Sequence, residues 1–455
     1  MKRDAEIFLD AWISSSNRKP LIIRGARQVG KSTLVRNFAA GKGLHLVEIN
    51  LEQSGKSNFW KTNQVNIIIR EIELIANKHI TPDSLLFIDE IQENPAAITA
   101  LRYFYEEVPQ IPVIAAGSLL EFTLNNTGYS MPVGRVQFYH LYPMTFKEVL
   151  MAGDESLLLE SLAEASKKGE IPTTAHEKLQ ALWKEFMFVG GMPEAVSSNL
   201  QGGGLKGARD VHRSIVQTFR YDFGKYGKRN IERIETLFNY VPVHSGEKIK
   251  YSNISKNNQA RDLKESLDCL IKARIAFPVY HSDCSGIPLK SGENKKVYKC
   301  YFMDTGLSSY MQGMKWRDFQ LDPSNLINSG KLTEQFVAQH LFSRERGIEA
   351  PELHYWLREG RSGNAEVDFV INNGAEIIPI EVKSGKAGAI RSLHQFMYSK
   401  GSGKALRFDA NPPSQQTVSA DVRTKKGTDR ITYTLDSFPV YMVEQVISDI
   451  LDRQD

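Results

Sequence analysis

The chain has 455 residues, of which 41% are hydrophobic and 24% are charged, as in an ordinary globular protein. Because a single hydrophobic core stops growing well below this length, we expect two to four domains. No apolar run approaches the roughly eighteen residues of a membrane span, and the N-terminus is too polar for a signal peptide. Three cysteines, Cys269, Cys284 and Cys300, cannot all pair and form no CxxC motif. These features argue against a membrane protein and predict a cytoplasmic one with reduced thiols.

The net charge of +4 is small for this length and by itself indicates no polyanionic partner. The distribution of the charge is more informative. Residues 201–300 contain 19 Lys and Arg against 10 Asp and Glu, so this segment carries +9 and the rest of the chain −5. The positive charge is therefore concentrated in the middle of the chain.

The first 152 residues alternate between helical and strand patterns. Residues 5–13 predict an amphipathic helix, residues 20–23 a strand that ends in a glycine loop, and residues 32–40 a second helix. Further strands are predicted at residues 44–51, 85–88, 112–116 and 136–141. Strands that alternate with helices are typical of a parallel α/β sheet. We expect one domain over residues 1–152.

The rest of the chain is expected to form three further units. Residues 153–240 have a helical pattern and predict a small helical lid. Residues 241–327 predict a strand, a short helix, a longer helix and another strand, which favours a compact winged-helix-like module. A helical pattern at residues 333–342 precedes strand patterns near residues 353–356, 366–371 and 377–382. We therefore expect a second α/β domain over residues 328–455.

One motif gives the strongest functional signal. Gly25-Ala26-Arg27-Gln28-Val29-Gly30-Lys31-Ser32, followed by Thr33, matches GxxxxGK[ST] between a predicted strand and a predicted helix. The glycines permit a tight loop whose backbone N–H groups surround phosphate oxygens, and the positive end of the helix dipole adds to the attraction. Lys31 supplies charge to the β- and γ-phosphates, and Ser32 offers a hydroxyl to Mg²⁺. The alternative is a chance glycine turn before a helix.

An acidic pair follows a later buried strand. Asp89 and Glu90 come directly after residues 85–88, at the strand end where open α/β sheets bind ligands. We expect Asp89 to hold Mg²⁺ through its water shell, and Glu90 to orient and polarise the attacking water. An acidic pair in this place can also be only a helix cap.

Two further features define the nucleotide. Ser118 ends the next predicted strand and is a candidate sensor of the γ-phosphate, although a serine after a glycine is also a common turn residue. No NKxD-type guanine reader follows the glycine loop. We therefore expect ATP, with Mg²⁺, rather than GTP.

With these residues assembled, the chain resembles a prokaryotic AAA-type ATPase family in which the ATPase core is followed by a C-terminal domain of uncharacterised function. The resemblance covers nearly the whole chain. Its matching segments are Gly25-Ala26-Arg27-Gln28-Val29-Gly30-Lys31-Ser32, Phe87-Ile88-Asp89-Glu90-Ile91-Gln92, Ala116-Gly117-Ser118, Gly134-Arg135, Leu141-Tyr142-Pro143-Met144-Thr145-Phe146, Gly190-Gly191-Met192-Pro193-Glu194 and Phe302-Met303-Asp304-Thr305-Gly306-Leu307.

The resemblance implies a sheet in which another strand lies between the glycine-loop strand and the strand of Asp89 and Glu90. It also implies nucleotide sites that neighbouring subunits complete, and hence a homo-oligomer. Arg135 is the arginine-finger candidate, and its alternative is a solvated or sheet-edge arginine. The family supplies no settled biological role.

A winged-helix-like module usually contacts nucleic acid, and here it coincides with the most basic part of the chain. The basic residues include Lys225, Lys228, Arg229, Lys248, Lys250 and Lys256. Contact with DNA phosphates is one interpretation. A solvated face or a protein-docking module is the other, because neither interleaved aromatic residues nor a DNA-reading motif accompanies the charges.

Glu334, Asp368, Glu381 and Lys383 follow the order of the PD-(D/E)xK core of restriction-endonuclease-like folds. Glu381 and Lys383 are two residues apart on a predicted strand and leave the same face, while Asp368 comes from a neighbouring strand to share a metal ion. Lys383 would lower the pKa of the attacking water or stabilise the phosphate charge. Because Val367 replaces the proline of the motif and ExK also occurs by chance, an ordinary strand and a fold that binds without cutting stay open.

Two functional hypotheses follow. The first is an oligomeric AAA-type ATPase that acts on DNA in remodelling, repair or defence, with nucleotide turnover changing how the basic module and the nuclease-like domain engage it. The second is a slow nucleotide-dependent signalling or scaffold switch that recruits a protein partner through the C-terminal half. Stimulation of ATP hydrolysis by DNA distinguishes the two.

Overall fold

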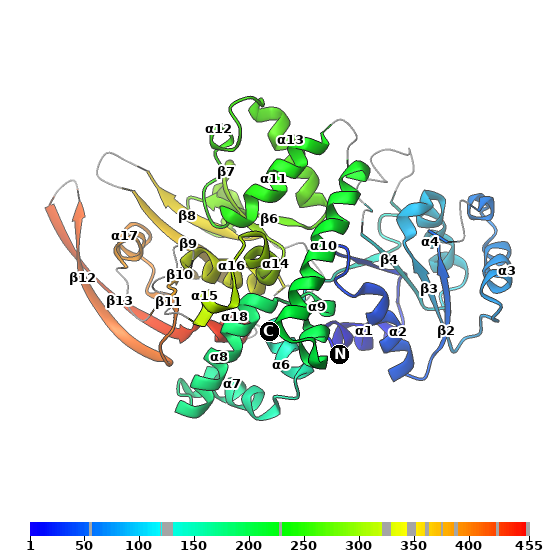
Figure 1. Cartoon of the computed structure of the whole chain (residues 1–455), viewed down its shortest axis with the longest axis horizontal. Coiled ribbons are helices and arrows are strands. Elements are labelled where there is room, and N and C mark those ends of the chain that lie inside the picture. Colours follow the sequence, from blue (N-terminus) through cyan, green and yellow to red (C-terminus); the bar gives the residue numbers. More distant parts are fainter. Residues whose placement is uncertain are drawn as a thin grey trace.

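The computed structural model describes residues 1–53, 57–118, 120, 131–226, 230–320, 329–343, 352–359, 364–374, 376–385, 390–424 and 427–451. The chain is elongated, with one sheet towards each end and a column of helices between them (Figure 1). Within the described residues, no helix combines the length and the apolar character that a membrane crossing requires.

The N-terminal sheet has five parallel strands in the order β2-β3-β4-β1-β5. These strands are β1 (Leu21–Arg24), β2 (His45–Asn50), β3 (Ser84–Asp89), β4 (Val113–Gly117) and β5 (Gln137–His140). The accompanying helices are α1 (Ala5–Ser14), α2 (Lys31–Gly41), α3 (Val65–Ala76) and α4 (Pro95–Glu107). Since β4 lies between β1 and β3, the strand order that the family resemblance implies is confirmed.

Helices cover both faces of this sheet, so its central strand β3 is buried on both sides. All six of its residues are buried, as expected for a central parallel strand. Leu85 and Phe87 belong to one apolar cluster, whereas Leu86 and Ile88 belong to another, because successive side chains leave opposite faces of a strand. Asp89 ends the strand at its carboxyl edge, where the two apolar layers stop.

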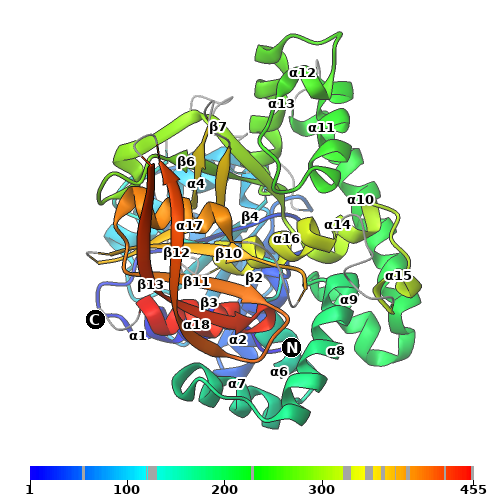
Figure 2. The same cartoon turned by 90° about the vertical axis from the view of Figure 1, so that its left-hand side faces the viewer.

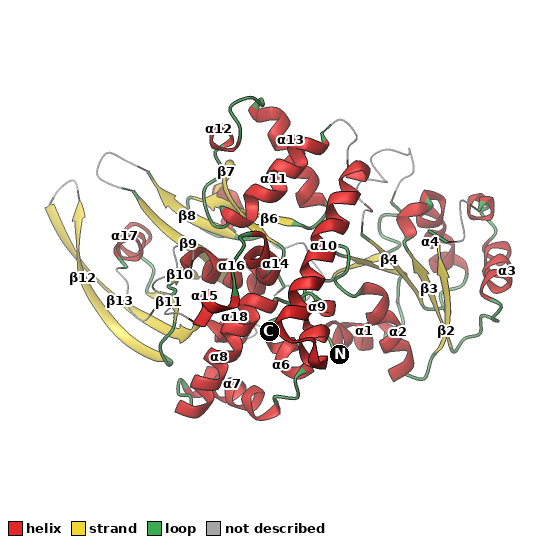
Figure 3. Cartoon of the chain, in the orientation of Figure 1, coloured by secondary structure: helices red, strands yellow, loops and turns green. Residues whose placement is uncertain are grey.

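The segment expected to form a helical lid is helical in the structure, and its helices stand between the two sheets (Figure 3). They are α7 (Ser156–Lys168), α8 (Thr173–Val189), α9 (Pro193–Ser198), α10 (Gly204–Tyr226) and α11 (Ile231–Val243), preceded by α6 (Phe146–Ala152). A capping box at Thr145 and Glu148 starts α6. The movement that the word lid implies stays a prediction.

The second sheet has eight strands in the order β12-β13-β11-β10-β9-β8-β6-β7. These strands are β6 (Ala276–Ser282), β7 (Glu293–Phe302), β8 (His354–Arg358), β9 (Ala365–Asn373), β10 (Glu376–Val382), β11 (Lys404–Asp409), β12 (Ser414–Thr424) and β13 (Gly427–Pro439). The helices of this half are α12 (Tyr251–Ile254), α13 (Ala260–Lys272), α14 (Thr305–Met311), α15 (Trp316–Gln320), α16 (Ser329–Phe342), α17 (Arg391–Lys400) and α18 (Val443–Leu451). The long β12–β13 hairpin forms the outer end (Figure 2).

One sheet spans the boundary that the sequence predicts between residues 327 and 328. Tyr280 and His281 of β6 pair in parallel with His354 and Tyr355 of β8. Strands from the expected winged-helix-like module and from the expected α/β domain are therefore hydrogen-bonded neighbours. The order α12, α13, β6 agrees with the predicted short helix, longer helix and strand. The strand predicted before the short helix is wrong, because this segment forms only a single bridge, between Lys248 and Lys299. The winged-helix character itself stays a prediction.

Two segments of the family resemblance meet between the halves. The Gly191 N–H donates to Asp304 Oδ2 at 2.6 Å, and a Cβ on Gly190 would lie 2.2 Å from Asp304 Oδ1. A Cβ on Gly191 would also lie 2.0 Å from the carbonyl oxygen of Met144. Glycine is required here because backbone from three parts of the chain approaches closely. This joint fixes the helical region to the strand β7 that precedes Asp304.

Candidate functional site

The glycine loop joins β1 directly to α2. A Cβ on Gly25 would lie 2.3 Å from the carbonyl oxygen of Leu141, so only glycine fits there. Gly30 has a φ of 91°, and its carbonyl accepts the first helical hydrogen bond, from Leu34 N at 2.9 Å. The loop thus ends at the N-terminus of an eleven-residue helix, whose first N–H groups have no partner within the helix. This is the backbone arrangement that a phosphate-binding loop requires.

Lys31 folds back over this loop. Its Nζ donates to the carbonyl oxygens of Gly25, at 3.1 Å, and Ala26, at 2.9 Å, and the residue is 8% exposed. Burial lowers the pKa of Lys31 to about 8, although Glu90 and Asp89 act in the opposite direction. The ammonium is therefore satisfied by neutral oxygens, which phosphate oxygens can replace.

Ser32 and Asp89 come together from neighbouring elements. Ser32 Oγ donates to Asp89 Oδ2 at 2.8 Å, and Asp89 is 5% exposed at the end of β3. Burial raises the pKa of Asp89, and the adjacent Glu90 raises it further, whereas the bond from Ser32 lowers it. A hydroxyl and a carboxylate are ligands that suit Mg²⁺ in phosphate-binding proteins. The two groups would hold that ion beside a bound nucleotide.

Glu90 and Ser118 lie at the same edge of the sheet. The Glu90 carboxylate accepts a hydrogen bond from Gln92 Nε2. Gln92 in turn packs on β4, since a Cβ on Gly117 would lie 2.6 Å from its Oε1. Ser118 follows Gly117 and is 7% exposed, and within the described chain its Oγ has no hydrogen-bond partner. A buried hydroxyl without a partner is suited to bind a ligand oxygen.

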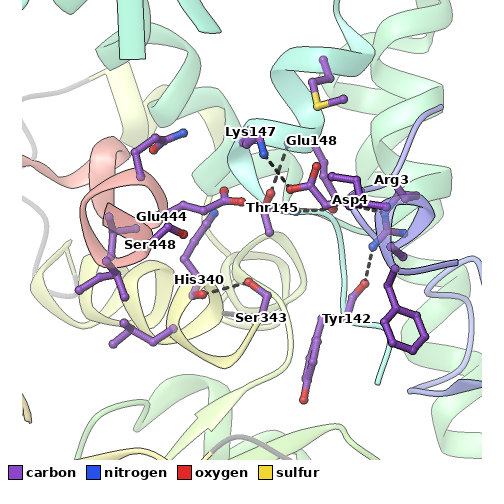
Figure 4. Close-up of a pocket in the computed structure, with 18 of the residues that line it drawn as sticks. Arg3, Asp4, Tyr142, Thr145, Lys147, Glu148, His340, Ser343, Glu444 and Ser448 are labelled. Carbon is purple, nitrogen blue, oxygen red and sulfur yellow. Dashed lines mark hydrogen bonds and ion pairs between the residues drawn. The ribbon is translucent and has the colours of Figure 1, made fainter. Parts of the chain in front are cut away.

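The other side of the loop is held by the N-terminal segment. Arg3 Nη1 donates to the Val29 carbonyl at 3.1 Å, and Nη2 donates to the Tyr142 carbonyl at 2.7 Å. Arg3 Nε also pairs with Glu148 Oε1 at 2.9 Å. Arg3, Tyr142 and Glu148 line a cavity of about 830 Å³ to which α1, α6, α16 and α18 also contribute (Figure 4). Arg3 therefore ties the loop to the start of the helical region.

The helical region contacts the loop at two further points. Arg27 Nε lies 2.5 Å from Asp222 Oδ2 on α10, and the two side chains are 19% and 8% exposed. Pro193, the first residue of α9, packs on Gly30, because a Cβ there would lie 3.4 Å from the proline ring. The segment expected to form the lid therefore touches the glycine loop directly.

We call the carboxyl edge of the first sheet, where Lys31, Asp89 and Glu90 lie, the nucleotide edge. Arg135 lies away from the nucleotide edge of its own chain. It precedes β5, whose first residue, Gln137, is in register with Leu21, the first residue of β1. Arg135 is thus at the amino edge of the sheet, whereas the glycine loop leaves the carboxyl edge. Its Nε pairs with Glu106 Oε1 at 2.8 Å, and its side chain is 44% exposed. Within one chain this is a sheet-edge arginine, and a finger role requires a neighbouring subunit.

The predicted basic face is described in part. Outside the described residues lie the side chain of Lys225, and Lys228 and Arg229 entirely. Lys250 and Lys256 are exposed on either side of α12. Lys248 is half-buried and pairs with Glu359 at 2.7 Å. Two of the predicted phosphate contacts are therefore accessible in the described part of the chain.

The predicted nuclease-like residues come from adjacent elements. Asp368 lies on β9, Glu381 lies on the paired strand β10, and Lys383 follows it. Asp368 Oδ2 accepts a hydrogen bond from the Val382 N–H at 2.8 Å, and Lys383 Nζ lies 2.6 Å from Glu381 Oε1. Glu334, on α16, is near enough for the charge of Asp368 to raise its pKa, and the charge of Glu334 in turn raises the pKa of Glu381. The structure thus brings the four residues together.

A further residue, Lys299 on β7, enters this group. Its side chain is 1% exposed, and its Nζ lies 3.1 Å from Glu334 Oε1 and 2.5 Å from Glu366 Oε1. The Tyr301 hydroxyl also donates to Glu334. Burial by itself would lower the pKa of Lys299, but the carboxylates of Glu334, Glu366 and Asp368 raise it above the ordinary value. The buried ammonium is therefore held in its charged form.

Burial also acts on the carboxylates of this group. Burial raises the pKa of Glu334 and of Asp368 to about 7, and it raises the pKa of Glu381 above its usual value. Among the described residues, no group of three or more His, Cys, Asp or Glu side chains is arranged to hold a metal ion. Glu334 and Glu366 instead have the Lys299 ammonium as their cationic partner, and Glu381 has that of Lys383.

The sequence motifs do not include three residues that contact the two candidate sites: Arg3, Asp222 and Lys299. Arg3 and Asp222 carry no local signal, because each acts on a loop that is distant in the sequence. Lys299 does carry one, since it interrupts the otherwise apolar residues 297–302. A lysine in such a run indicates a buried charge with a partner, but the sequence does not say which.

The sheet order and the glycine-loop geometry together define an AAA-type P-loop domain, a class that binds ATP with Mg²⁺. The family comparisons agree, because residues 17–150 match an AAA domain. Residues 180–318 and 329–425 match two domains of unknown function, DUF8612 and DUF4143.

A comparison with curated proteins gave no match. Among solved structures, the chain is similar to the ORC2 protein of Aeropyrum pernix, determined as ADPNP and ADP complexes. The identity is 13%, the match covers 70% of this chain and 93% of that one, and the TM-score is 0.33. A likeness at this level carries no functional argument.

Proposed function

We propose that the chain is an ATP-hydrolysing enzyme that works as a homo-oligomer and acts on DNA. The catalytic part rests on one observation: Lys31, the Ser32–Asp89 pair and Glu90 meet at the carboxyl edge of an AAA-type sheet. In this proposal Lys31 and the loop N–H groups bind the phosphates, while Ser32 and Asp89 hold Mg²⁺. Ser118 contacts the γ-phosphate through its hydroxyl.

Glu90 orients and polarises the water that attacks the γ-phosphate. The hydrogen bond from Gln92 fixes the direction of its carboxylate, so the group is positioned before the nucleotide arrives. Arg135 of a neighbouring subunit stabilises the charge that develops on the transferred phosphoryl group. To do so it leaves Glu106, which is possible because both side chains are partly exposed.

The DNA part of the proposal rests on charge. Residues 201–300 carry +9, and Lys250 and Lys256 are exposed beside α12. Exposed lysines neutralise phosphates and release counterions, so binding of this kind weakens as salt rises. Replacing both by alanine is expected to reduce the slope of log K against log salt by about 2. Lys168→Ala on α7, also exposed, is the matched control.

A second candidate function, the nucleotide-dependent switch, is favoured by the contacts between the glycine loop and the helical region. Arg27 pairs with Asp222, and Pro193 packs on Gly30, so a change in the loop on nucleotide binding reaches α9 and α10. The joint between Gly191 and Asp304 continues this path to the second sheet. A switch would use the path to present the C-terminal half to a protein partner.

The test is ATP turnover of the full chain with single-stranded, duplex and branched DNA. We expect turnover that Glu90→Gln removes, and stimulation by at least one DNA that disappears at high salt. If turnover ignores every DNA and no salt-sensitive binding occurs, the DNA role is wrong and the switch is the better proposal. If no turnover above that of Glu90→Gln is seen, the enzymatic role is wrong.

A further inference from the structure

The four carboxylates Glu334, Glu366, Asp368 and Glu381 form what we call the acidic cluster. We propose that the Lys299 ammonium occupies the cation position of this cluster, so that the C-terminal half has no metal-dependent nuclease activity. The proposal is independent of the ATPase role, because the cluster lies on the second sheet and α16.

The first support is geometric. Lys299 Nζ bridges Glu334 at 3.1 Å and Glu366 at 2.5 Å, and its charge also acts on Asp368. The Tyr355 ring lies 5.0 Å from the same ammonium. A Cβ on Gly246 would lie 2.9 Å from Glu334 Oε1, so the backbone there leaves room for the carboxylate that Lys299 needs.

The second support is the burial of the ammonium. A divalent ion shared by Asp368 and Glu381 would place two further positive charges close to a buried ammonium, and like charges repel strongly where water is excluded. Moving Lys299 aside would leave it buried without a partner, since its side chain is only 1% exposed.

The third support is that the lysine and the carboxylates come from different predicted domains. Lys299 belongs to β7, whereas Glu334, Asp368 and Glu381 come from the segment that the sequence separates from it at residue 327. The segment before residue 328 therefore supplies the positive charge that neutralises the carboxylates after it. The two expected modules form one electrostatic unit, which the nuclease-like residues alone do not reveal.

The experiment uses electron paramagnetic resonance to measure Mn²⁺ binding to the full chain in the absence of nucleotide. An Asp89→Asn background removes the candidate ligand at the nucleotide site. This parent is expected to bind no Mn²⁺ at the acidic cluster and to cleave no DNA with Mn²⁺. Lys299→Ala is expected to gain one bound ion per chain, and the addition of Asp368→Asn to remove it. Lys295→Ala, on the same strand and 76% exposed, is the matched control and should gain none.

If Lys299→Ala does not fold, Lys299→Met combined with Glu334→Gln removes one charge of each sign and leaves three carboxylates. It is also expected to gain an ion. Cleavage of the chain by radicals generated at bound Fe²⁺ locates the site. Cuts near residues 334, 368 and 381 in the parent would overturn the proposal, as would a folded Lys299 variant that gains no ion. A parent without cuts and a variant with them would establish it.

Discussion

The nucleotide edge and the acidic cluster contain the same kinds of residue but differ in the groups that accept hydrogen bonds from the lysine. Each places a carboxylate on a buried strand and a lysine beside it. Lys31 is bonded to two neutral backbone carbonyls, whereas Lys299 is bonded to two carboxylates. Phosphate oxygens can replace neutral carbonyls with a gain in charge pairing, but they cannot replace carboxylates in this way.

The pKa directions express the same difference. Burial lowers the pKa of Lys31 to about 8, so its ammonium lacks sufficient negative charge around it. The pKa of Lys299 is raised, since the effect of its carboxylates exceeds that of burial. A buried cation that lacks a counter-charge favours an anionic ligand, whereas one that has its own counter-charges contributes to the fold. Convergence of motif residues therefore does not by itself define a site.

The largest expected effect tests whether the nucleotide edge is completed by a second chain. Arg135→Ala is expected to lower ATP turnover by about 10³ to 10⁵-fold, because a finger stabilises charge mainly in the transition state. ATP binding should weaken far less. Arg102→Ala removes another partner of Glu106 and is the matched control. Mixing Arg135→Ala with Lys31→Ala chains should restore some turnover, whereas a wild-type rate in Arg135→Ala would exclude the residue from catalysis.

The next effect separates binding from chemistry at the same edge. Glu90→Gln is expected to keep ATP affinity and to slow hydrolysis by about 10² to 10⁴-fold, because the amide no longer polarises the attacking water. Lys31→Ala should abolish useful ATP binding, since it removes the phosphate charge. Fluorescent-nucleotide titration and turnover assays measure the two quantities. Equal losses of affinity would contradict the assigned roles. Glu93→Gln is the matched control, since Glu93 ends the short helix Ile91–Glu93 that follows Glu90.

A smaller effect concerns stability and addresses the acidic cluster. Lys299→Ala is expected to lower the free energy of unfolding by about 3 to 5 kcal/mol, because it leaves buried carboxylates without their counter-charge. Lys383→Ala should cost less, since that side chain is 27% exposed and water can reach it. Urea unfolding followed by tryptophan fluorescence compares the two. A larger loss for Lys383→Ala would mean that Lys299 is not the principal neutralising group.

The local parts of both sites could be predicted from the sequence. The glycine loop is one contiguous motif, and Asp89 and Ser118 follow apolar runs that end at the same sheet edge. The spacing of Glu381 and Lys383 likewise indicates one face of a strand. The position of β4 between β1 and β3 came only from the family resemblance.

The remaining features depend on contacts that no local pattern records. Lys299 and Glu366 are 67 positions apart, and Arg27 and Asp222 are 195 apart. The pairing of β6 with β8 involves two residues on each strand, which leaves no periodic signal for one continuous sheet. The sequence also does not predict the strands after residue 382. Most of β12 and the first half of β13 are exposed and polar, and β11 is an apolar run too short to be told from a helical segment by its pattern.

The last prediction uses pH to compare the two lysines. In the nucleotide-free protein the pKa of Lys31 is about 8, so above that pH the side chain is mostly neutral. Bound phosphates favour the charged form, and nucleotide binding therefore takes up a proton there. ATP affinity should be nearly constant below about pH 8 and fall by up to about tenfold per pH unit above it, until the ordinary lysine pKa near 10.4.

Calorimetric titration in two buffers of different ionisation heat measures this proton uptake directly. Lys31→Arg keeps its charge at every pH in this range and should give an affinity that changes far less with pH, even if the affinity itself is lower. Lys299, whose pKa is raised, should contribute no such dependence, so Lys299→Ala should leave the profile unchanged. An affinity that does not change between about pH 8 and 10 in the wild type would mean that Lys31 already has its counter-charge before the nucleotide binds, and the contrast between the two lysines would be lost.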